Sequence, residues 1–349
     1  MKRIVLCAAA CLLLIACGKP NAAETAEDVR EAEKTVPMTV SEAKPEPAPA
    51  DEPFASENPT LEPEPTEETV AFAGPEQTEE PAELPPVPPE KRFPGHFSET
   101  PVLDAEGMRY TGSKVDIRIR ICHETDTYAK RITYYVADIY VADVTSIRTI
   151  AAQGDFTMRY ERRVKEIASD AGAILAIDGD TYTHVRNSFV IRNGVLYRDT
   201  PIENTDICIL YRDGTMETKK WGTFTAQEVI DADPWQVWGF GPALLDEEGH
   251  AISIDHHLAG HNPRAAIGYF EPGHYCFVVV DGQRGGKDNG SDGIRLSAFS
   301  QLMADLGCKA AYNLDGGDSA QMYWNGAIIN KSNNESRVIS DIIYILPEP

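Results

Sequence analysis

Apolar and polar residues alternate in short runs from about residue 93 to the end of the chain. The stretch VDIRIRIC is typical of a strand with one buried face. Longer runs rich in Val, Ile and Tyr predict more deeply buried strands. Together these patterns predict strands at 114–122, 131–142, 147–151, 173–177, 189–192, 195–197, 207–211, 265–270, 275–280, 310–314, 320–324 and 341–346.

Three stretches carry apolar residues at helical spacing and predict helices over 159–170, 225–231 and 294–306. Thr225 is expected to cap the second helix together with Glu228. Many strands, few helices and no internal repeat predict a single domain of the α+β or mixed α/β class, with a many-stranded mixed sheet.

The alternation of apolar and polar runs is absent before residue 93. Residues 18–92 are dominated by Pro, Glu, Ala and Thr, and they contain too little apolar surface to offset the entropy cost of ordering. We therefore predict a disordered acidic Pro-rich linker, followed by a folded domain over 93–349. Residues 93–146 either join the main sheet of that domain or form a small β subdomain.

The first residues, MKRIVLCAAACLLLIACGKP, combine two basic residues with a short apolar stretch. This stretch is too short to span a bilayer and is typical of a signal peptide, here residues 1–17. The end LIACG resembles a bacterial lipobox, which implies lipidation of Cys17. The sequence thus predicts an exported protein anchored by lipid to the outer face of the cell membrane. A plain secretory signal is the alternative.

The 349 residues carry a net charge of −23, which argues against nucleic acid as a partner. Four cysteines lie outside the signal peptide, and none has metal-ligand spacing. The histidines of DHHLAGHNPR match no metal motif and predict a polar loop. No dinucleotide or P-loop fingerprint is present. Composition therefore leaves the carboxylates as the main candidates for chemistry.

Three predicted strands end in Asp followed by Gly, at Asp178-Gly179-Asp180, Asp281-Gly282 and Asp315-Gly316-Gly317-Asp318. The last two strands are joined through a predicted helix, so we expect them to run in the same direction and to place Asp281 and Asp315 at one sheet edge. Clustered carboxylates suit general acid–base catalysis. Solvated hairpin turns are the alternative interpretation.

Two further features surround these strand ends. Asp288 and Asp292, in KDNGSDG, could offer oxygen ligands to Ca²⁺, although the EF-hand pattern is incomplete. Arg264 and Arg284 offer planar donors that fit a phosphate, or alternatively form structural ion pairs. We expect no required cofactor, with Ca²⁺ as an optional ligand.

The stretch NLDGGDSAQMYWNG, residues 313–326, resembles the NLDGGGSSTM signature of the phosphodiester glycosidase domain. Four further pieces resemble elements of the same family in the same order, and the resemblance spans 147–346. They are AIDGDTY, FGPALLDEEG, NPRAAIG and VVVDGQR.

The resemblance implies hydrolysis of a sugar-1-phosphodiester, such as an N-acetylglucosamine-1-phosphodiester, in envelope or extracellular glycans. Arg264 would hold the phosphate, and Asp281 and Asp315 would handle water and protonation. The resemblance implies catalytic roles for Asp178, Asp281, Asp315 and Arg264, and substrate binding by Asp180, Arg284, Asn313, Gly316, Gly317 and Ser319.

This chain departs from the family pattern by adding acids. Asp178 replaces an Asn, Asp180 and Asp318 replace glycines, and Arg284 is displaced by one position. Extra carboxylates repel a phosphodiester unless a proton or cation neutralises them. One alternative is therefore a non-catalytic glycan-binding lipoprotein, which would present Trp235, Trp238 and Trp324 to the cleft. The other is a calcium-dependent structural module.

Overall fold

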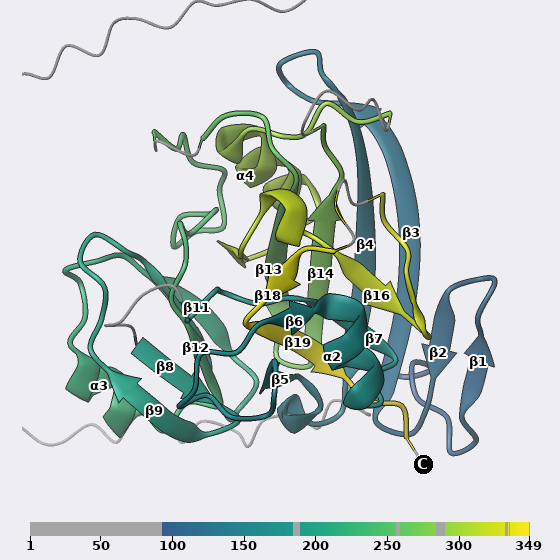
Figure 1. The fold of residues 1–349 in the computed structure, drawn as a ribbon, viewed down its shortest axis with the longest axis horizontal. Helices are drawn as coiled ribbons and strands as arrows, with labels where there is room; N and C mark the ends of the chain where they lie inside the picture. The colour runs from purple at the N-terminus through teal and green to yellow at the C-terminus, as the bar shows by residue number, and fades with distance from the viewer. Residues whose placement is uncertain are drawn as a thin grey trace, which may run out of the picture. The chain divides into compact units, whose positions relative to one another are not determined.

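The computed structural model describes residues 93–183, 189–255, 259–283, 290–331, 334 and 336–348, which fall in one compact unit. Its largest element is a seven-stranded sheet (Figure 1). The strands follow one another across this sheet in the order β1 (Val102–Asp104), β2 (Arg109–Thr111), β3 (Val115–Thr125), β4 (Arg131–Val141), β14 (His274–Val280), β13 (Arg264–Glu271) and β15 (Ala310–Asn313).

Residues 93–146 contribute directly to this main sheet. β4 pairs with β14 over seven residues, from Tyr140 opposite His274 to Tyr134 opposite Val280. The long β3–β4 hairpin therefore extends the central strands and is not a separate β subdomain.

β14 is buried on both faces because its sequence is apolar at every position from Tyr275 onward. Alternate residues, among them Phe277, pack into the core against the other sheets. The intervening residues, among them Val278, pack with Phe299 of helix α4 (Leu296–Asp305) on the opposite face. The strand is thus fixed between two cores, and its end is held in place.

Two five-stranded sheets and one two-stranded sheet complete the unit. One has the order β11 (Met216–Lys219), β10 (Ile207–Leu210), β12 (Gln236–Trp238), β8 (Phe189–Arg192) and β9 (Val195–Asp199). The second has the order β17 (Ala327–Ile328), β16 (Met322–Trp324), β7 (Leu175–Asp178), β19 (Asp341–Ile345) and β5 (Arg148–Ala151). The smallest pairs β18 (Val338–Ile339) with β6 (Arg162–Arg163).

Helices are few and short, as expected. α3 (Ala226–Asp231) begins at the predicted capping box, in which Thr225 and Glu228 bond reciprocally. α2 (Val164–Asp170) is shorter than predicted, because Arg162 and Arg163 pair as β6 instead of starting the helix. Single 3₁₀ turns, η1 (Val144–Ser146) and η2 (Gly317–Ser319), complete the helical elements among the described residues.

The fold class is confirmed: one domain built mostly of strands, with few helices. The strands divide among several sheets, and each recorded strand pair is antiparallel. β13 is antiparallel to both of its neighbours, β14 and β15, so those two strands run in the same direction. The strand–helix–strand prediction is therefore correct, although β13 lies between the two strands.

No helix among the described residues is long and apolar enough to cross a bilayer. The signal peptide 1–17 with Cys17, and the linker 18–92, lie outside the described residues and remain predictions.

Candidate functional site

The candidate site is built around residues 315–321, which follow β15. Asp315 donates its backbone N–H to Gly179 O at 3.1 Å, and Gly317 N donates to Pro263 O at 2.9 Å. Gln321 N donates to the carboxylate of Asp178 at 3.2 Å. The segment is thus tied to the end of β7 and to the start of β13. Two sheets meet here, so the three Asp-Gly strand ends converge although β7 belongs to a different sheet.

Asp178 is the last residue of β7 and is completely buried. One oxygen accepts the Gln321 N–H, whereas Oδ2 has no hydrogen-bond partner among the described residues. Burial raises the pKa of this carboxyl well above its usual range, and the nearby carboxylate of Asp315 raises it further. Burial therefore favours the uncharged form of Asp178.

Arg264 begins β13 at the same sheet edge. Its guanidinium donates to Gly260 O at 2.8 Å and is 4 % exposed. A Cβ on Gly316 would lie 3.0 Å from Pro263 O and 3.9 Å from Arg264 Cδ. Glycine at this position lets the loop backbone lie close to the carbonyl oxygen of Pro263, next to the arginine. Burial lowers the pKa of Arg264 to about 10, so it remains a cation at neutral pH.

A second arginine reaches the same loop from the C-terminal part of the chain. Arg337 Nε donates to Ser319 Oγ at 3.1 Å, just before β18 begins. Ser319 itself is buried within η2. A hydroxyl held by a cation is a natural partner for a phosphate oxygen.

Asp281 follows β14 and is also buried. Its carboxylate accepts from Asn330 Nδ2 at 3.1 Å, and Asn330 also donates to Ala320 O at 3.1 Å. Burial raises the pKa of Asp281, and the hydrogen bond from Asn330 partly offsets that increase. Asp281 is therefore linked to the loop through Asn330.

Asp180 lies in the interior instead of facing outward. Arg192 Nη2 donates to its Oδ1 at 2.7 Å, and Gly239 N donates to its Oδ2 at 2.8 Å. Arg192 is completely buried, donates also to Val237 O, and lies 3.7 Å from a carboxylate oxygen of Asp341. Both oxygens of Asp180 are therefore engaged inside the protein, which favours a positioning role over substrate binding.

One buried arginine thus faces two buried carboxylates, and a single cation cannot neutralise both. Burial, followed by the negative charge of Asp180, raises the pKa of Asp341 to about 8, while Arg192 acts in the opposite direction. The Asp341 carboxyl also lies against Gly179, where a Cβ would be 2.4 Å from Oδ1. Asp341 therefore carries a proton at neutral pH.

This proton makes stability depend on pH. An unfolded Asp releases its proton near pH 4, whereas Asp341 keeps it to about pH 8. Because the folded state binds more protons in that window, the free energy of unfolding should fall as the pH rises through it, by at most about 1.4 kcal/mol per pH unit for one proton. Urea unfolding at pH 5 to 8 should show a shallower fall for Asp341→Asn. Equal slopes for the variant and wild type would contradict the assignment.

The other residues predicted for the site or for calcium binding lie in different parts of the chain. Asn313 donates from Nδ2 to Gly241 O at 2.8 Å and so holds the neighbouring loop. Asp292 accepts from Arg131 and Gln283, and Arg131 lowers its pKa. Arg284 and Asp288 lie outside the described residues. The predicted calcium position therefore remains a hypothesis from sequence.

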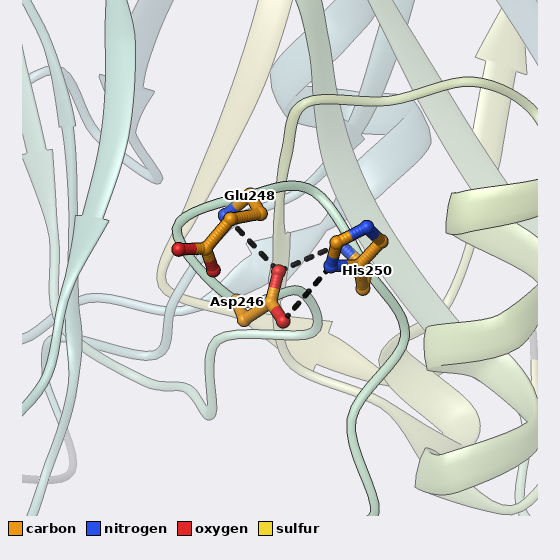
Figure 2. A group of neighbouring side chains, drawn as sticks. All are labelled: Asp246, Glu248 and His250. Carbon is orange, nitrogen blue, oxygen red and sulfur yellow. Dashed lines mark hydrogen bonds and ion pairs between the residues drawn. The ribbon is translucent and has the colours of Figure 1, made fainter.

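One group of described side chains has metal-compatible distances: Asp246, Glu248 and His250 (Figure 2). The Asp246 carboxylate accepts the backbone N–H groups of Glu248 and His250 at 3.1 and 2.7 Å. The group closes an exposed hairpin between Leu245 and Ala251. Its hydrogen bonds serve the turn, and nothing else at this position indicates a metal.

The tryptophans named for the glycan-binding alternative do not form an open platform. Trp238 and Trp324 are buried in the main core. Trp235 is half-buried, donates its indole N–H to Ile147 O at 2.7 Å and is covered by Arg212. The exposed tryptophan among the described residues is Trp221, which is distant in sequence from every strand end of the site.

Four residues of this region are not predicted from the sequence: Arg192, Asn330, Arg337 and Asp341. Two of them had a usable signal, because Arg192 ends the apolar run FVIR and Asp341 begins DIIYIL. A charge at the boundary of a buried strand needs a partner, which points to such a pair. Asn330 and Arg337 lie in the polar stretch NKSNNESR, where the sequence offers no signal.

Comparisons with known proteins identify a family and related folds. The profile of the phosphodiester glycosidase family matches residues 171–346. An uncharacterized SPbeta prophage-derived protein of Bacillus subtilis (strain 168), YomE, is 29% identical over 162 residues, which are 44% of this chain and 24% of that protein. The chain thus spans about a quarter of this curated relative.

Two solved structures are among those similar to this chain. The catalytic domain of zebrafish N-acetylglucosamine-1-phosphodiester alpha-N-acetylglucosaminidase superposes with a TM-score of 0.55 at 20% identity, covering 67% of this chain and 84% of that one. A hypothetical protein from Synechocystis gives a TM-score of 0.45 at 14% identity, covering 66% and 62%.

Proposed function

Because the chain belongs to the phosphodiester glycosidase family, we propose that it hydrolyses the bond between a sugar anomeric carbon and a phosphodiester in envelope or extracellular glycans. The observation that carries the proposal is the convergence on residues 315–321 of Asp315, Arg264 and the Ser319–Arg337 pair. The loop combines a carboxylate for a water with cationic donors for a phosphate.

The reaction assigns a task to each group. Arg264 and the Ser319–Arg337 pair bind the phosphate oxygens. Asp315, which is less buried than Asp178, takes a proton from the water that bonds to the anomeric carbon. The anomeric C–O bond breaks, and the phosphate leaves as a monoester. Asp281 acts indirectly, by holding Asn330 and through it the loop.

Burial and ion pairing make two of the three extra acids, Asp178 and Asp180, compatible with an anionic substrate. Burial favours the uncharged form of Asp178, Asp341 holds a proton, and Asp180 is paired with Arg192. Of these acids none presents a free negative charge to the phosphate. In its uncharged form, which burial favours, Asp178 can donate a hydrogen bond, as the amide of the family's Asn can.

The direct test offers the purified chain UDP-N-acetylglucosamine and simple glycosyl-1-phosphodiesters in H₂¹⁸O. A phosphodiester glycosidase places ¹⁸O on the anomeric carbon of the released sugar. A phosphodiesterase would place it on phosphorus, which would replace the proposed reaction with P–O cleavage. Saturable glycan binding without release of any sugar would favour the non-catalytic alternative.

Arg337→Gln is expected to lower kcat/KM by about tenfold to a hundredfold, because a charged hydrogen bond to phosphate is worth about 1.5–3 kcal/mol. Initial rates against substrate concentration measure the change. The matched control is Arg212→Gln, an exposed arginine paired with Asp233. Equal losses in both variants would mean that Arg337 has no specific role.

Membrane attachment is a separate proposal that rests on the N-terminal sequence. We expect full-length protein to partition with membranes and Cys17→Ala to be released from them. Retention of that variant in the membrane fraction would contradict lipidation at Cys17.

A further inference from the structure

Two cysteines from separate parts of the chain lie against each other in the main sheet. Cys276 Sγ and Cys308 Sγ are 3.7 Å apart, and both side chains are buried. Both thiols are free in this structure. The other two cysteines of the domain, Cys122 and Cys208, lie on β3 and β10. The contact between Cys276 and Cys308 is not part of the catalytic loop proposed above.

The strand that runs between the two cysteines has a glycine where the sulfur atoms meet. Gly268 of β13 pairs with Cys276 of β14 on one side and with Ala311 of β15 on the other. A Cβ at Gly268 would lie only 2.7 Å from each of the two sulfur atoms. Because glycine has no Cβ, the sulfur atoms can approach each other over β13.

A bond between the two sulfur atoms would close a long loop of the chain. Cys276 lies within β14, and Cys308 lies between α4 and β15, 32 positions further along. The closed loop contains α4 and also Asp281, which follows β14. A disulfide that closes a loop of this length restricts the unfolded chain strongly. The bond would therefore stabilise the strands that precede Asp281 and Asp315.

Helix α4 covers the cysteine pair and limits its reactivity once the protein has folded. Met303 of α4 packs in the same apolar cluster as Cys276 and Cys308. The hydrogen bond with Cys308, together with burial, raises the pKa of Cys276 well above its usual range. Since the thiolate is the reactive form of cysteine, the buried pair should react slowly. Oxidation should therefore occur before α4 packs onto the sheet.

We propose that Cys276 and Cys308 are joined by a disulfide bond in the exported protein. Export, which the N-terminal sequence predicts, leads to a compartment where disulfides persist. The bond forms by exchange with a disulfide oxidant: each cysteine loses a proton and an electron, the S–S bond forms, and the oxidant is reduced to two thiols. The bond links β14 to the start of β15 across β13 and takes no part in hydrolysis.

Peptide mapping of the full-length exported protein tests the bond directly. The protein is alkylated with iodoacetamide in denaturant and digested with trypsin without reductant, which leaves Cys276 in peptide 265–284 and Cys308 in peptide 296–309. These two peptides are expected as one linked species that separates on reduction, whereas Cys122 and Cys208 are alkylated directly. Alkylated Cys276 and Cys308, or a link from either one to another cysteine, would overturn the proposal.

Reduction should also lower the stability of the protein. We expect the midpoint of urea unfolding of the wild type to move to lower urea in the presence of a reductant, because the unfolded chain regains conformational freedom. The double variant Cys276→Ala/Cys308→Ala should not respond to the reductant, and Cys122→Ala should respond as the wild type does. A wild-type midpoint that is the same with and without reductant would contradict the bond. Neither measurement uses a substrate, so failure here is distinguishable from failure of the hydrolase assay.

Discussion

Asp315→Asn is expected to lower kcat by at least about a hundredfold, because general acid–base groups contribute about 10²–10⁴ to rate. Asp315 lies at the meeting point of the two sheets and is less buried than the neighbouring Asp178. An amide has the same shape but cannot accept the proton of the attacking water. The measurement is sugar release under substrate saturation.

The substitution should leave the fold intact, which makes the kinetic result interpretable. Asp315 Oδ1 accepts the N–H of Gly316 at 2.8 Å, and the Asn side-chain oxygen can accept the same bond. Asp305→Asn, at an exposed position at the end of α4, provides the matched control. Turnover within a factor of two of wild type, with unchanged thermal stability, would remove Asp315 from the mechanism.

Strand ends were predictable because their pattern is local. The run from Tyr275 to Val280 predicts a buried strand, and Asp281-Gly282 marks its end. The helix between this strand and β15 then determines that both run in the same direction. Those steps place Asp281 and Asp315 at one edge, where the structure also has them.

Partners that come from distant parts of the chain were not predictable in this way. Arg337 bonds Ser319 across 18 residues and Asn330 bonds Asp281 across 49 residues, through segments without apolar periodicity. The shortest strands, such as β6 and β18, also have no pattern of their own, because two residues show no period. Contacts between distant parts of the chain determine both these side-chain partners and these short strands.

The direction of the Asp180 side chain was likewise not predictable from the sequence. Its position after a strand, between Gly179 and Thr181, suggests an exposed ligand-binding acid. The structure instead directs it toward Arg192 of β8, which reaches it from another sheet. A motif therefore locates the backbone of a site but does not show which of its acids faces the substrate.

Arg192→Met should lower the free energy of unfolding by about 3–5 kcal/mol, which is the usual effect of removing one partner from a buried ion pair. The substitution leaves Asp180 buried without its cation, beside Asp341. Equilibrium urea unfolding measures the loss. Arg212→Met, which removes an exposed arginine from its pair with Asp233, should change stability by less than about 1 kcal/mol.

The pH dependence identifies the cause of that loss. Without Arg192, Asp180 can avoid an uncompensated charge only by binding a proton, so the destabilisation should be larger at pH 8 than at pH 5. Adding Asp180→Asn to Arg192→Met should restore part of the stability at pH 8, because the unpaired charge is then gone. A loss that is the same at both pH values would indicate lost packing of the arginine side chain instead. In that case the charge balance that keeps Asp180 and Asp341 compatible with an anionic substrate would have to come from other groups.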